Sequence, residues 1–205
     1  MVATPRTKGR LISWAFGYDL LVKAFLFGRE RSFRERILDL ARLRAGDVML
    51  DVGCGTGTLA IQAARRIGAG SVTGIDASGP MIARAISKAK RAGVSVDFRE
   101  AIVEALPFAD ASFDVVTSTM MLHHLGRVGR EECAREIKRV LKPGGRVLAV
   151  DFNNPGKKRG IIGHLHRHGH VDVRYLVELV ENAGFTIVDR GGVGVRDLQF
   201  VLAVK

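Results

Sequence analysis

The chain has 205 residues, which suits one domain with a substantial core. Apolar residues make up 47% of it, which excludes an intrinsically disordered protein, and its two cysteines are too few for a disulfide framework. The net charge of +11 favours anionic partners such as nucleic acid, anionic lipid or phosphorylated substrates, or else forms a solvated basic face.

The N-terminal part is predicted to form two helices, over 10–27 and 30–43, which join at Gly28. Residues 1–44 hold ten Lys and Arg against four Asp and Glu, a net charge of +6. The apolar stretch 11–28 is interrupted by charged residues, whereas a spanning helix needs ~20 mostly uncharged apolar residues. We therefore expect no membrane span, and because no signal peptide is evident we expect a reducing, cytoplasmic setting.

Strands and helices alternate from residue 48 onward. The predicted strands are 48–52, 71–76, 94–98, 113–119, 145–152, 185–190 and 198–205. The predicted helices are 57–67, 79–92, 129–141 and 172–183, the third stopped by Pro143. This order predicts an α/β fold: a doubly wound, mostly parallel, seven-stranded Rossmann-like sheet with helices on both faces. The short Gly-rich link before the last strand predicts an antiparallel hairpin.

A glycine cluster follows the first of these strands, in "VMLDVGCGTGTLA" (48–60). An apolar run that ends in Asp51, Gly53, Gly55 and Gly57 indicates a buried strand, a tight turn and a helix start. Such a turn brings bare backbone close to a ligand, because glycine has no Cβ. Two ligand classes use it: dinucleotides, whose pyrophosphate sits on the helix N-terminus, and S-adenosylmethionine.

Two acids bear on the choice between these ligands. Asp76 ends the second strand, 23 residues after Gly53, where a carboxylate can accept hydrogen bonds from both ribose hydroxyls of either ligand. "GTGTLA" satisfies the loose dinucleotide pattern G-x-G-x-x-A. Asp51, two residues before the first glycine, has no role beside a pyrophosphate but suits the ammonium and sulfonium charges of S-adenosylmethionine.

Several motifs occur in a fixed order along the chain: "YDLL", "VMLDVGCGTG", "GIDASGPMIARA", "EALPFADASFDVV", "MLHHL" and "EIKRVLKPGGRVLAVDF". Together they resemble the class I S-adenosylmethionine-dependent methyltransferases, and within them the ubiquinone/menaquinone-biosynthesis C-methyltransferase branch, over residues 14–155. The resemblance implies a single domain over 1–205, with an N-terminal helical lid over 1–45, a cofactor-binding core over 46–205 and a substrate loop near 153–171. It also implies S-adenosyl-L-methionine as cofactor and S-adenosyl-L-homocysteine as its product.

The resemblance assigns cofactor-binding positions to five parts of the chain. Tyr18 of the lid would contact the methionine part, Asp76 the ribose, and Ala77 and Met81 the adenine. The other positions implied are Asp51, Gly53, Cys54, Gly55 and Gly57 in the loop, Ile102 and Val103 beside the adenine, and Ser118 and Thr119 at the end of the fourth strand. One position departs from the family: Ile102 stands where relatives carry an Asp that accepts from the adenine amino group, and the loss of one hydrogen bond is worth ~0.5–1.5 kcal/mol.

Histidines stand at two places. His123 and His124 follow the fourth strand and are the candidate catalytic residues, through proton handling or as a helix-start feature. The segment "GHLHRHGH" places His164, His166, His168 and His170 at alternate positions. A metal site is one interpretation. A polar substrate loop is the interpretation we favour, and no metal is needed for the transfer.

The acceptor is expected to be small and lipophilic, such as a quinone-like phenol or a natural product. A phospholipid headgroup or another membrane-bound acceptor is the alternative, because the basic, apolar residues 6–36 resemble an interfacial helix that associates weakly with anionic membranes. A third hypothesis is an NAD-binding oxidoreductase or a catalytically idle nucleoside-binding module. Nucleic acid is not an expected partner, because the chain has no aromatic-rich binding strand and no Asn/Asp-Pro-Pro-aromatic tetrapeptide.

Overall fold

A computed structural model describes residue 9 and residues 28–153, 172–195 and 197–205. The predicted helix over 10–27, Tyr18 and the four histidines of the substrate loop lie outside these residues. The described helices are α2 (Glu30–Leu40), α3 (Thr58–Ile67), α4 (Gly79–Ala92), the 3-10 turn η1 (Leu122–His124), α5 (Arg127–Val140) and α7 (Val173–Asn182). The strands are β1 (Val48–Val52), β2 (Ser71–Asp76), β3 (Asp97–Glu100), β4 (Phe113–Thr119), β5 (Leu141–Phe152), β6 (Thr186–Gly192) and β7 (Leu198–Val204).

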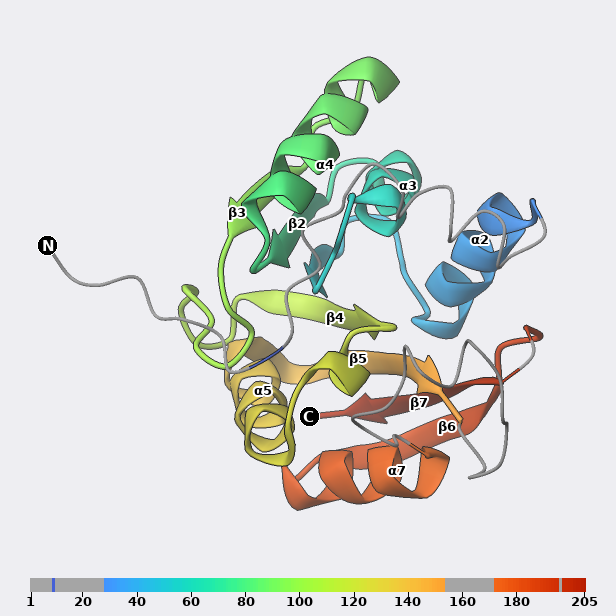
Figure 1. Ribbon diagram of the computed structural model, residues 1–205, viewed down its shortest axis with the longest axis vertical. Coiled ribbons are helices and arrows are strands. Elements are labelled where there is room, and N and C mark those ends of the chain that lie inside the picture. Colours follow the sequence, from blue (N-terminus) through green and yellow to red (C-terminus); the bar gives the residue numbers. More distant parts are fainter. Residues whose placement is uncertain (1–8, 10–27, 154–171, 196) are drawn as a thin grey trace, which may run out of the picture.

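The described strands form one seven-stranded sheet in the order β3-β2-β1-β4-β5-β7-β6 (Figure 1). The first five strands pair in parallel, whereas β7 is antiparallel to both β5 and β6. The predicted mostly parallel sheet and its terminal hairpin are therefore confirmed. The order reverses between β1 and β4, so the carboxyl ends of these two central strands form the switch point at which such sheets bind ligands.

The sheet is buried on both faces. Along β1, Met49 packs in the core cluster of one face and Leu50 in the cluster of the other, because successive side chains of a strand point to opposite sides. The helices α2, α3 and α4 contribute to the first cluster, and α5 and α7 to the second (Figure 1). Helices on both faces explain why the central strands are nearly continuous apolar runs.

Several boundaries differ from the prediction. The helix expected over 30–43 ends at Leu40, and the strand expected over 185–190 spans 186–192. The third strand was expected over 94–98 but is β3 at 97–100, because Gly93 closes α4 in the left-handed conformation and Val94 N–H still bonds the carbonyl of Ala89. Helix α5 begins at 127 rather than 129. It ends at Val140, and Leu141 already pairs with Phe113 across an irregular register, so Pro143 lies inside the start of β5 rather than in a loop before 145.

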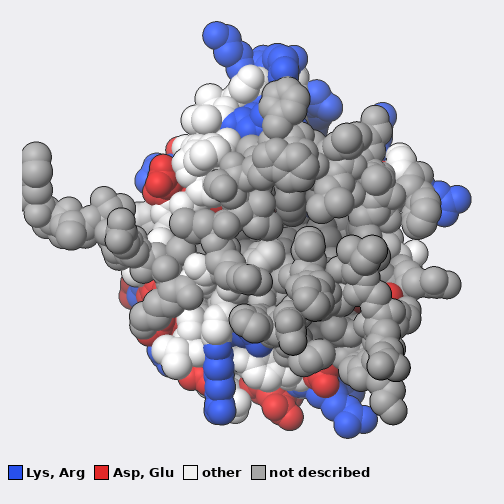
Figure 2. Space-filling view, in the orientation of Figure 1, with Lys and Arg blue, Asp and Glu red and all other residues white. Residues whose placement is uncertain are grey.

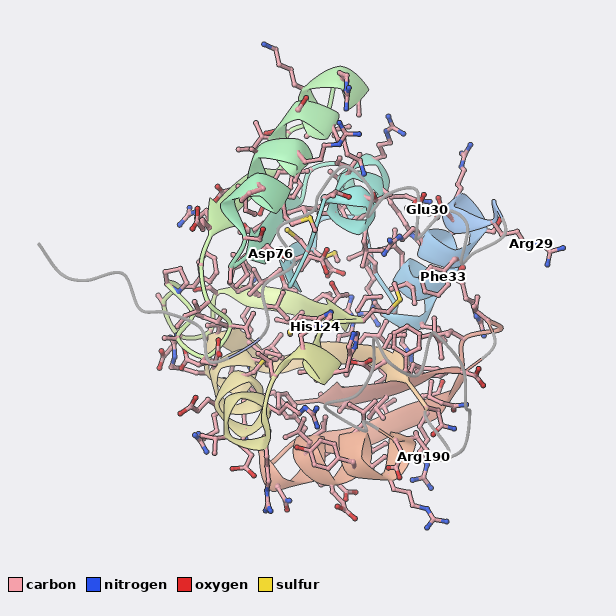
Figure 3. The ribbon with its side chains drawn as sticks, in the orientation of Figure 1. Arg29, Glu30, Phe33, Asp76, His124 and Arg190 are labelled. Carbon is pink, nitrogen blue, oxygen red and sulfur yellow. The ribbon has the colours of Figure 1, made fainter. Side chains whose placement is uncertain are left out.

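The described helices include none that is both long and apolar enough to cross a membrane. Basic side chains are spread over the described surface: Figure 2 shows blue groups at the far end of α4 and mixed blue and red groups around the rim. Figure 3 shows Arg29 and Arg190 pointing outward at the periphery, whereas Asp76 and His124 lie toward the middle of the molecule.

Candidate functional site

The turn from β1 into α3 carries the glycine cluster at the carboxyl end of the central strand. Gly53, Gly55 and Gly57 all have positive φ, at 70°, 53° and 75°. A Cβ at Gly53 would lie 2.2 Å from Met121 Cγ, and one at Gly57 would lie 2.5 Å from Phe98 Cζ. At these two positions glycine is therefore required by the packing of the chain itself and by the left-handed backbone, whatever ligand binds.

Asp76 ties this turn to the next strand. Its Oδ2 accepts a hydrogen bond from Gly55 N–H at 2.9 Å, and its Oδ1 accepts one from Ser78 N–H at 2.9 Å. Burial raises the pKa of the Asp76 carboxyl above its ordinary value, and these two backbone bonds oppose the rise. Each carboxylate oxygen keeps a second lone pair with which it can accept from a ligand hydroxyl.

Asp51 lies beneath the same turn. It is opposite Thr117 in the parallel pair β1–β4, and its Oδ1 accepts a hydrogen bond from Thr117 Oγ1 at 2.7 Å. The residue is 2% exposed, and burial raises its pKa to about 6, against the lowering effects of Thr117 and of the Arg34 charge. A buried carboxylate with a raised pKa is a site that a cation would stabilise.

A pocket opens between the glycine turn, α2 and the end of β4. It is lined by Arg34, Asp51, Gly53, Cys54, Gly55, Thr56, Thr58, Leu59, Thr119 and Met120. Three buried polar atoms near it have no hydrogen-bond partner among the described residues: Arg34 Nε, Ser118 Oγ and Thr119 Oγ1. Buried polar groups are normally paired, so these atoms indicate a polar ligand. Met120 has φ of 53°, a left-handed conformation that is uncommon for a methionine.

The positions expected beside an adenine lie around the end of β2. Ala77 directly follows Asp76, and Met81 is buried in the first turn of α4. Ala101 N–H donates to the carbonyl of Asp76 at 3.0 Å, which holds the start of the segment with Ile102 and Val103 against this strand end. The structure therefore brings these predicted residues to the same edge of the sheet as Asp76.

His123 is held by a buried carboxylate. Its Nδ1 lies 2.7 Å from Oδ1 of Asp151, and its backbone N–H donates to Oδ2 of the same residue at 3.1 Å. Asp151 ends the apolar part of β5 and has no exposed surface. The Nδ1–H tautomer satisfies this geometry, which leaves the lone pair on Nε2. The ring of His124 lies 3.9 Å from that of His123.

A metal-dependent reaction and a cysteine nucleophile both find little support among the described residues. They include no group of three His, Cys, Asp or Glu side chains placed to hold a metal ion. Burial raises the pKa of both thiols, Cys54 and Cys133, so neither carries an activated nucleophile.

The residues at the site that were not identified from the sequence include Arg34, Thr117, Met120 and Asp151. Asp151 carried a signal, because it ends a predicted strand at the edge where ligands bind. Arg34 and Thr117 lie in segments whose sequence reads as ordinary helix or strand, and Met120 directly follows β4. The expected roles of Tyr18 and of His164, His166, His168 and His170 stay predictions, since these residues lie outside the described part of the chain.

A glycine turn with positive φ, a carboxylate with lone pairs left for ligand hydroxyls (Asp76) and a second, buried carboxylate (Asp51) fit a nucleoside ligand that carries positive charge. S-adenosylmethionine has that chemistry, and the unpaired buried hydroxyls and guanidinium nitrogen supply further groups to hold it.

Comparison with known proteins points the same way. A sequence family described as a methyltransferase domain matches residues 49–145. The demethylmenaquinone methyltransferase of Thermus thermophilus is 39% identical over 150 residues, which are 73% of this chain and 66% of that protein. The ubiquinone/menaquinone biosynthesis C-methyltransferase of Bdellovibrio bacteriovorus is 34% identical over 138 residues, 67% of this chain and 58% of that protein. The chain thus matches about two thirds or less of the length of these relatives.

Solved structures share the fold. A methyltransferase from Aquifex aeolicus, described as dependent on S-adenosylmethionine, superimposes with a TM-score of 0.73 at 22% identity, covering 83% of this chain and 88% of that one. The [4+2]-cyclase SpnF superimposes with a TM-score of 0.71 at 24% identity, covering 100% of this chain and 87% of that one. At this level of identity the likeness shows the fold alone, and the cyclase illustrates that one fold hosts different reactions.

Proposed function

The chain belongs to the class I S-adenosylmethionine-dependent methyltransferases, and from that premise we propose that it transfers a methyl group to a small, lipophilic, quinone-like acceptor. The observation that carries the proposal is a pair of carboxylates on either side of the glycine turn, the buried Asp51 and the half-buried Asp76. Their raised pKa values make the site one that favours a cation. S-adenosylmethionine brings an activated, positively charged methyl donor, so the protein mainly has to orient the partners.

The residues of the chain would divide this work among them. Asp76 accepts from the ribose hydroxyls, while the same carboxylate keeps the turn in place through Gly55. Asp51, oriented by the Thr117 hydroxyl, lies nearest to a positive charge in the methionine part. Ala77, Met81, Ile102 and Val103 would flank the adenine. The unpaired hydroxyls of Ser118 and of Thr119, which lines the pocket, would supply further polar contacts.

Asp51 argues against a dinucleotide, whereas Asp76 would suit the ribose of either ligand. A pyrophosphate carries two negative charges, and the Asp51 carboxylate beneath the turn would repel it. A catalytically idle nucleoside-binding module fits these contacts equally well, and only an activity assay separates it from the enzyme.

We propose that His123 takes the proton that the substrate loses when it receives the methyl group. Carbon and oxygen nucleophiles of the phenol type lose a proton when they react, and a positioned imidazole can take it. The Asp151 carboxylate fixes the tautomer in which Nε2 is basic and would stabilise the imidazolium that forms. His124 is the second candidate, and its ring lies tilted at 47° beside that of His123.

The acceptor class rests on the named relatives, which act in menaquinone and ubiquinone biosynthesis according to their names. Part of each relative lies outside the matched region, so the acceptor is an inference from these names and from the chemistry of His123. A phospholipid headgroup or another membrane-associated acceptor is the alternative, motivated by the basic, apolar residues 6–36. With that alternative we also propose that the protein attaches peripherally to an anionic membrane and that residues 1–45 form a lid over the site.

The test is a product screen by mass spectrometry. The protein is incubated with S-adenosylmethionine and, in parallel, with phenols, quinols and phospholipid vesicles. We expect a product heavier by one methyl group, formed in equal amount to S-adenosylhomocysteine, from a quinol or phenol. Product from a phospholipid would favour the alternative acceptor. Failure of S-adenosylmethionine and S-adenosylhomocysteine to raise the melting temperature, while NAD does, would contradict the proposed function altogether.

A further inference from the structure

The peptide group between Leu122 and His123 lies between two buried charges. Its N–H, which belongs to His123, donates to Oδ2 of Asp151 at 3.1 Å. Its carbonyl, which belongs to Leu122, accepts from Nε of Arg130 at 2.8 Å. The N–H and the C=O of a trans peptide point in opposite directions, so the carboxylate and the guanidinium hold this one group from opposite sides.

Arg130 is a charged residue that α5 buries. It is 6% exposed, whereas Arg127 and Arg135 of the same helix are exposed. Among the described residues it forms no direct ion pair with an acid. Taking a guanidinium out of water is costly unless its N–H groups and its charge find partners. The Leu122 carbonyl is such a partner, and so is the ring of Tyr175, whose centroid lies 5.3 Å from the guanidinium carbon.

The two charges match the dipole of the peptide that they hold. The N–H end of a peptide carries partial positive charge and here faces the Asp151 carboxylate, while the negative C=O end faces the Arg130 guanidinium. Hydrogen bonds that form such a chain polarise one another, and both of these bonds involve an ionised group. Arg130 therefore opposes the charge of the fully buried Asp151 through the peptide rather than by direct contact.

This arrangement fixes both the backbone and the ring of His123. Oδ2 of Asp151 accepts from the backbone N–H, and Oδ1 of the same carboxylate lies 2.7 Å from Nδ1 of the ring. A rotation of the peptide would therefore disturb the ring as well. Within the turn, the Leu122 carbonyl accepts only from Leu125 N–H, at 3.0 Å, and Arg130 adds a second donor to it. Because a 3-10 turn has few and poorly aligned hydrogen bonds of its own, this outside donor matters for its rigidity.

We propose that Arg130 is a positioning residue for His123. By holding the Leu122 carbonyl it fixes the turn from the side opposite to Asp151, and it thereby keeps the imidazole in the Nδ1–H tautomer with a basic Nε2. This inference rests on the proposed function, in which His123 takes the proton of the acceptor, and adds to it the residue that keeps the base in place.

The experiment uses variants that separate the donor of Arg130 from its charge. Arg130→Gln keeps a donor and removes the charge, because the glutamine amide nitrogen stands at the same place along the side chain as Nε. Arg130→Met puts a methyl group at that place and removes both. Arg135→Met is the matched control, since it makes the same change at an exposed position of the same helix.

Two readouts are combined. The NMR spectrum of the imidazole nitrogens, recorded on protein with isotope-labelled histidine, reports the tautomer of His123 and needs no acceptor; His123→Gln identifies its signals. Turnover is measured with the acceptor that the product screen yields, beside calorimetric titration with S-adenosylhomocysteine. If Arg130→Met does not fold, Arg130→Lys replaces it, because lysine keeps the charge but has a methylene group at the place of Nε.

We expect the Nδ1–H tautomer of His123 in the unmodified chain, in Arg135→Met and in Arg130→Gln, and a mixture of both tautomers in Arg130→Met or its lysine replacement. Turnover should fall roughly 10- to 100-fold in Arg130→Met, the effect of one lost hydrogen bond to a charged group, and about 5-fold or less in Arg130→Gln. The affinity for S-adenosylhomocysteine should stay the same in all of them.

The inference would be overturned if Arg130→Met matched Arg135→Met in tautomer and turnover, or if Arg130→Gln lost as much as Arg130→Met. Equal losses of turnover and of S-adenosylhomocysteine affinity would also contradict it, because they would show a merely structural role. If instead the tautomer responds as expected but no acceptor is methylated, the proposed function fails while the link between Arg130 and the His123 ring stands.

Discussion

Gly55 and Asp76 are joined by a hydrogen bond of 2.9 Å from the backbone N–H of the first to Oδ2 of the second. The acid at the end of β2 therefore holds the turn that follows β1, in addition to its proposed contact with the ribose. Because Oδ1 accepts from Ser78 as well, the carboxylate links the turn to the start of α4 before any ligand arrives. A substitution at this residue is expected to act on both the ligand and the turn.

Asp76→Ala is predicted to weaken S-adenosylhomocysteine binding by 100-fold or more. Two charge-assisted hydrogen bonds to the ribose would be lost, each worth ~1.5–3 kcal/mol, and the two backbone donors would lose their acceptor. Calorimetric titration measures the affinity, and a denaturant titration measures the accompanying loss of stability. Unchanged affinity would remove the ribose assignment.

Ile102→Asp is predicted to have a much smaller effect of opposite sign. The carboxylate would restore an acceptor for the adenine amino group, and one added hydrogen bond is worth ~0.5–1.5 kcal/mol, or about 2- to 10-fold in affinity. The comparison uses the same titration. Weaker binding in this variant would indicate that the adenine does not lie beside residue 102.

Asp51→Asn is predicted to stabilise the ligand-free protein at neutral pH. The folded pKa of Asp51, about 6, lies above its ordinary value of 3.8 because the carboxyl is buried. A group with a raised pKa contributes stability that is fully present below pH 3.8 and is lost as the pH rises through about 6. The asparagine keeps an oxygen that can accept from Thr117 but never ionises. At pH 7 its free energy of unfolding should exceed that of the unmodified chain by about 1–3 kcal/mol, with the gap closing toward pH 4.

The same substitution should reduce affinity for S-adenosylmethionine, because the neutral amide no longer attracts the cation. Denaturant titrations at several pH values and one ligand titration at pH 7.5 check both parts. A stability difference that does not vary with pH would show that Asp51 is not the buried acid described above.

Gly55→Val is predicted to abolish cofactor binding and to leave most of the fold intact. Gly55 has φ of 53°, which a β-branched residue adopts only with strain, and the branched side chain would stand on the turn that faces the pocket. Circular dichroism reports the fold, and the melting temperature with S-adenosylhomocysteine reports binding. Normal binding by a folded variant would mean that the loop is only a turn.

His123→Gln is predicted to lower turnover by 10²-fold or more without changing the affinity for S-adenosylhomocysteine. His124→Gln should cost less, since Asp151 orients the ring of His123. Asp151→Asn should share much of the His123 defect, because the amide can no longer stabilise an imidazolium. The readouts are the rate of product formation and the ligand titration. Equal turnover in His123→Gln and the unmodified chain would exclude a proton-handling role.

The sequence alone determined the features that depend on local pattern. Short segments of five to seven residues rich in β-branched and apolar side chains were sufficient for β1, β2 and β4, and the glycine cluster placed the turn after β1. Asp51 and Asp76 could be identified for the same reason: each occupies a defined place at the end of a strand in a parallel sheet, where the edge that binds ligands is fixed by the chain direction. Boundaries were less well determined where one element runs directly into the next, as at Val140 and Leu141.

Only the tertiary structure decided which side chains meet. Asp151 reaches His123 across 28 positions, and Thr117 reaches Asp51 across 66, through strand pairings that no local pattern specifies. The structure also turned Arg34 inward while Arg31 and Arg36 of α2 face solvent, and it placed Phe98 where a Cβ of Gly57 would be. Such contacts depend on register and packing between elements distant in sequence, whereas periodicity reports only which face of each element is buried.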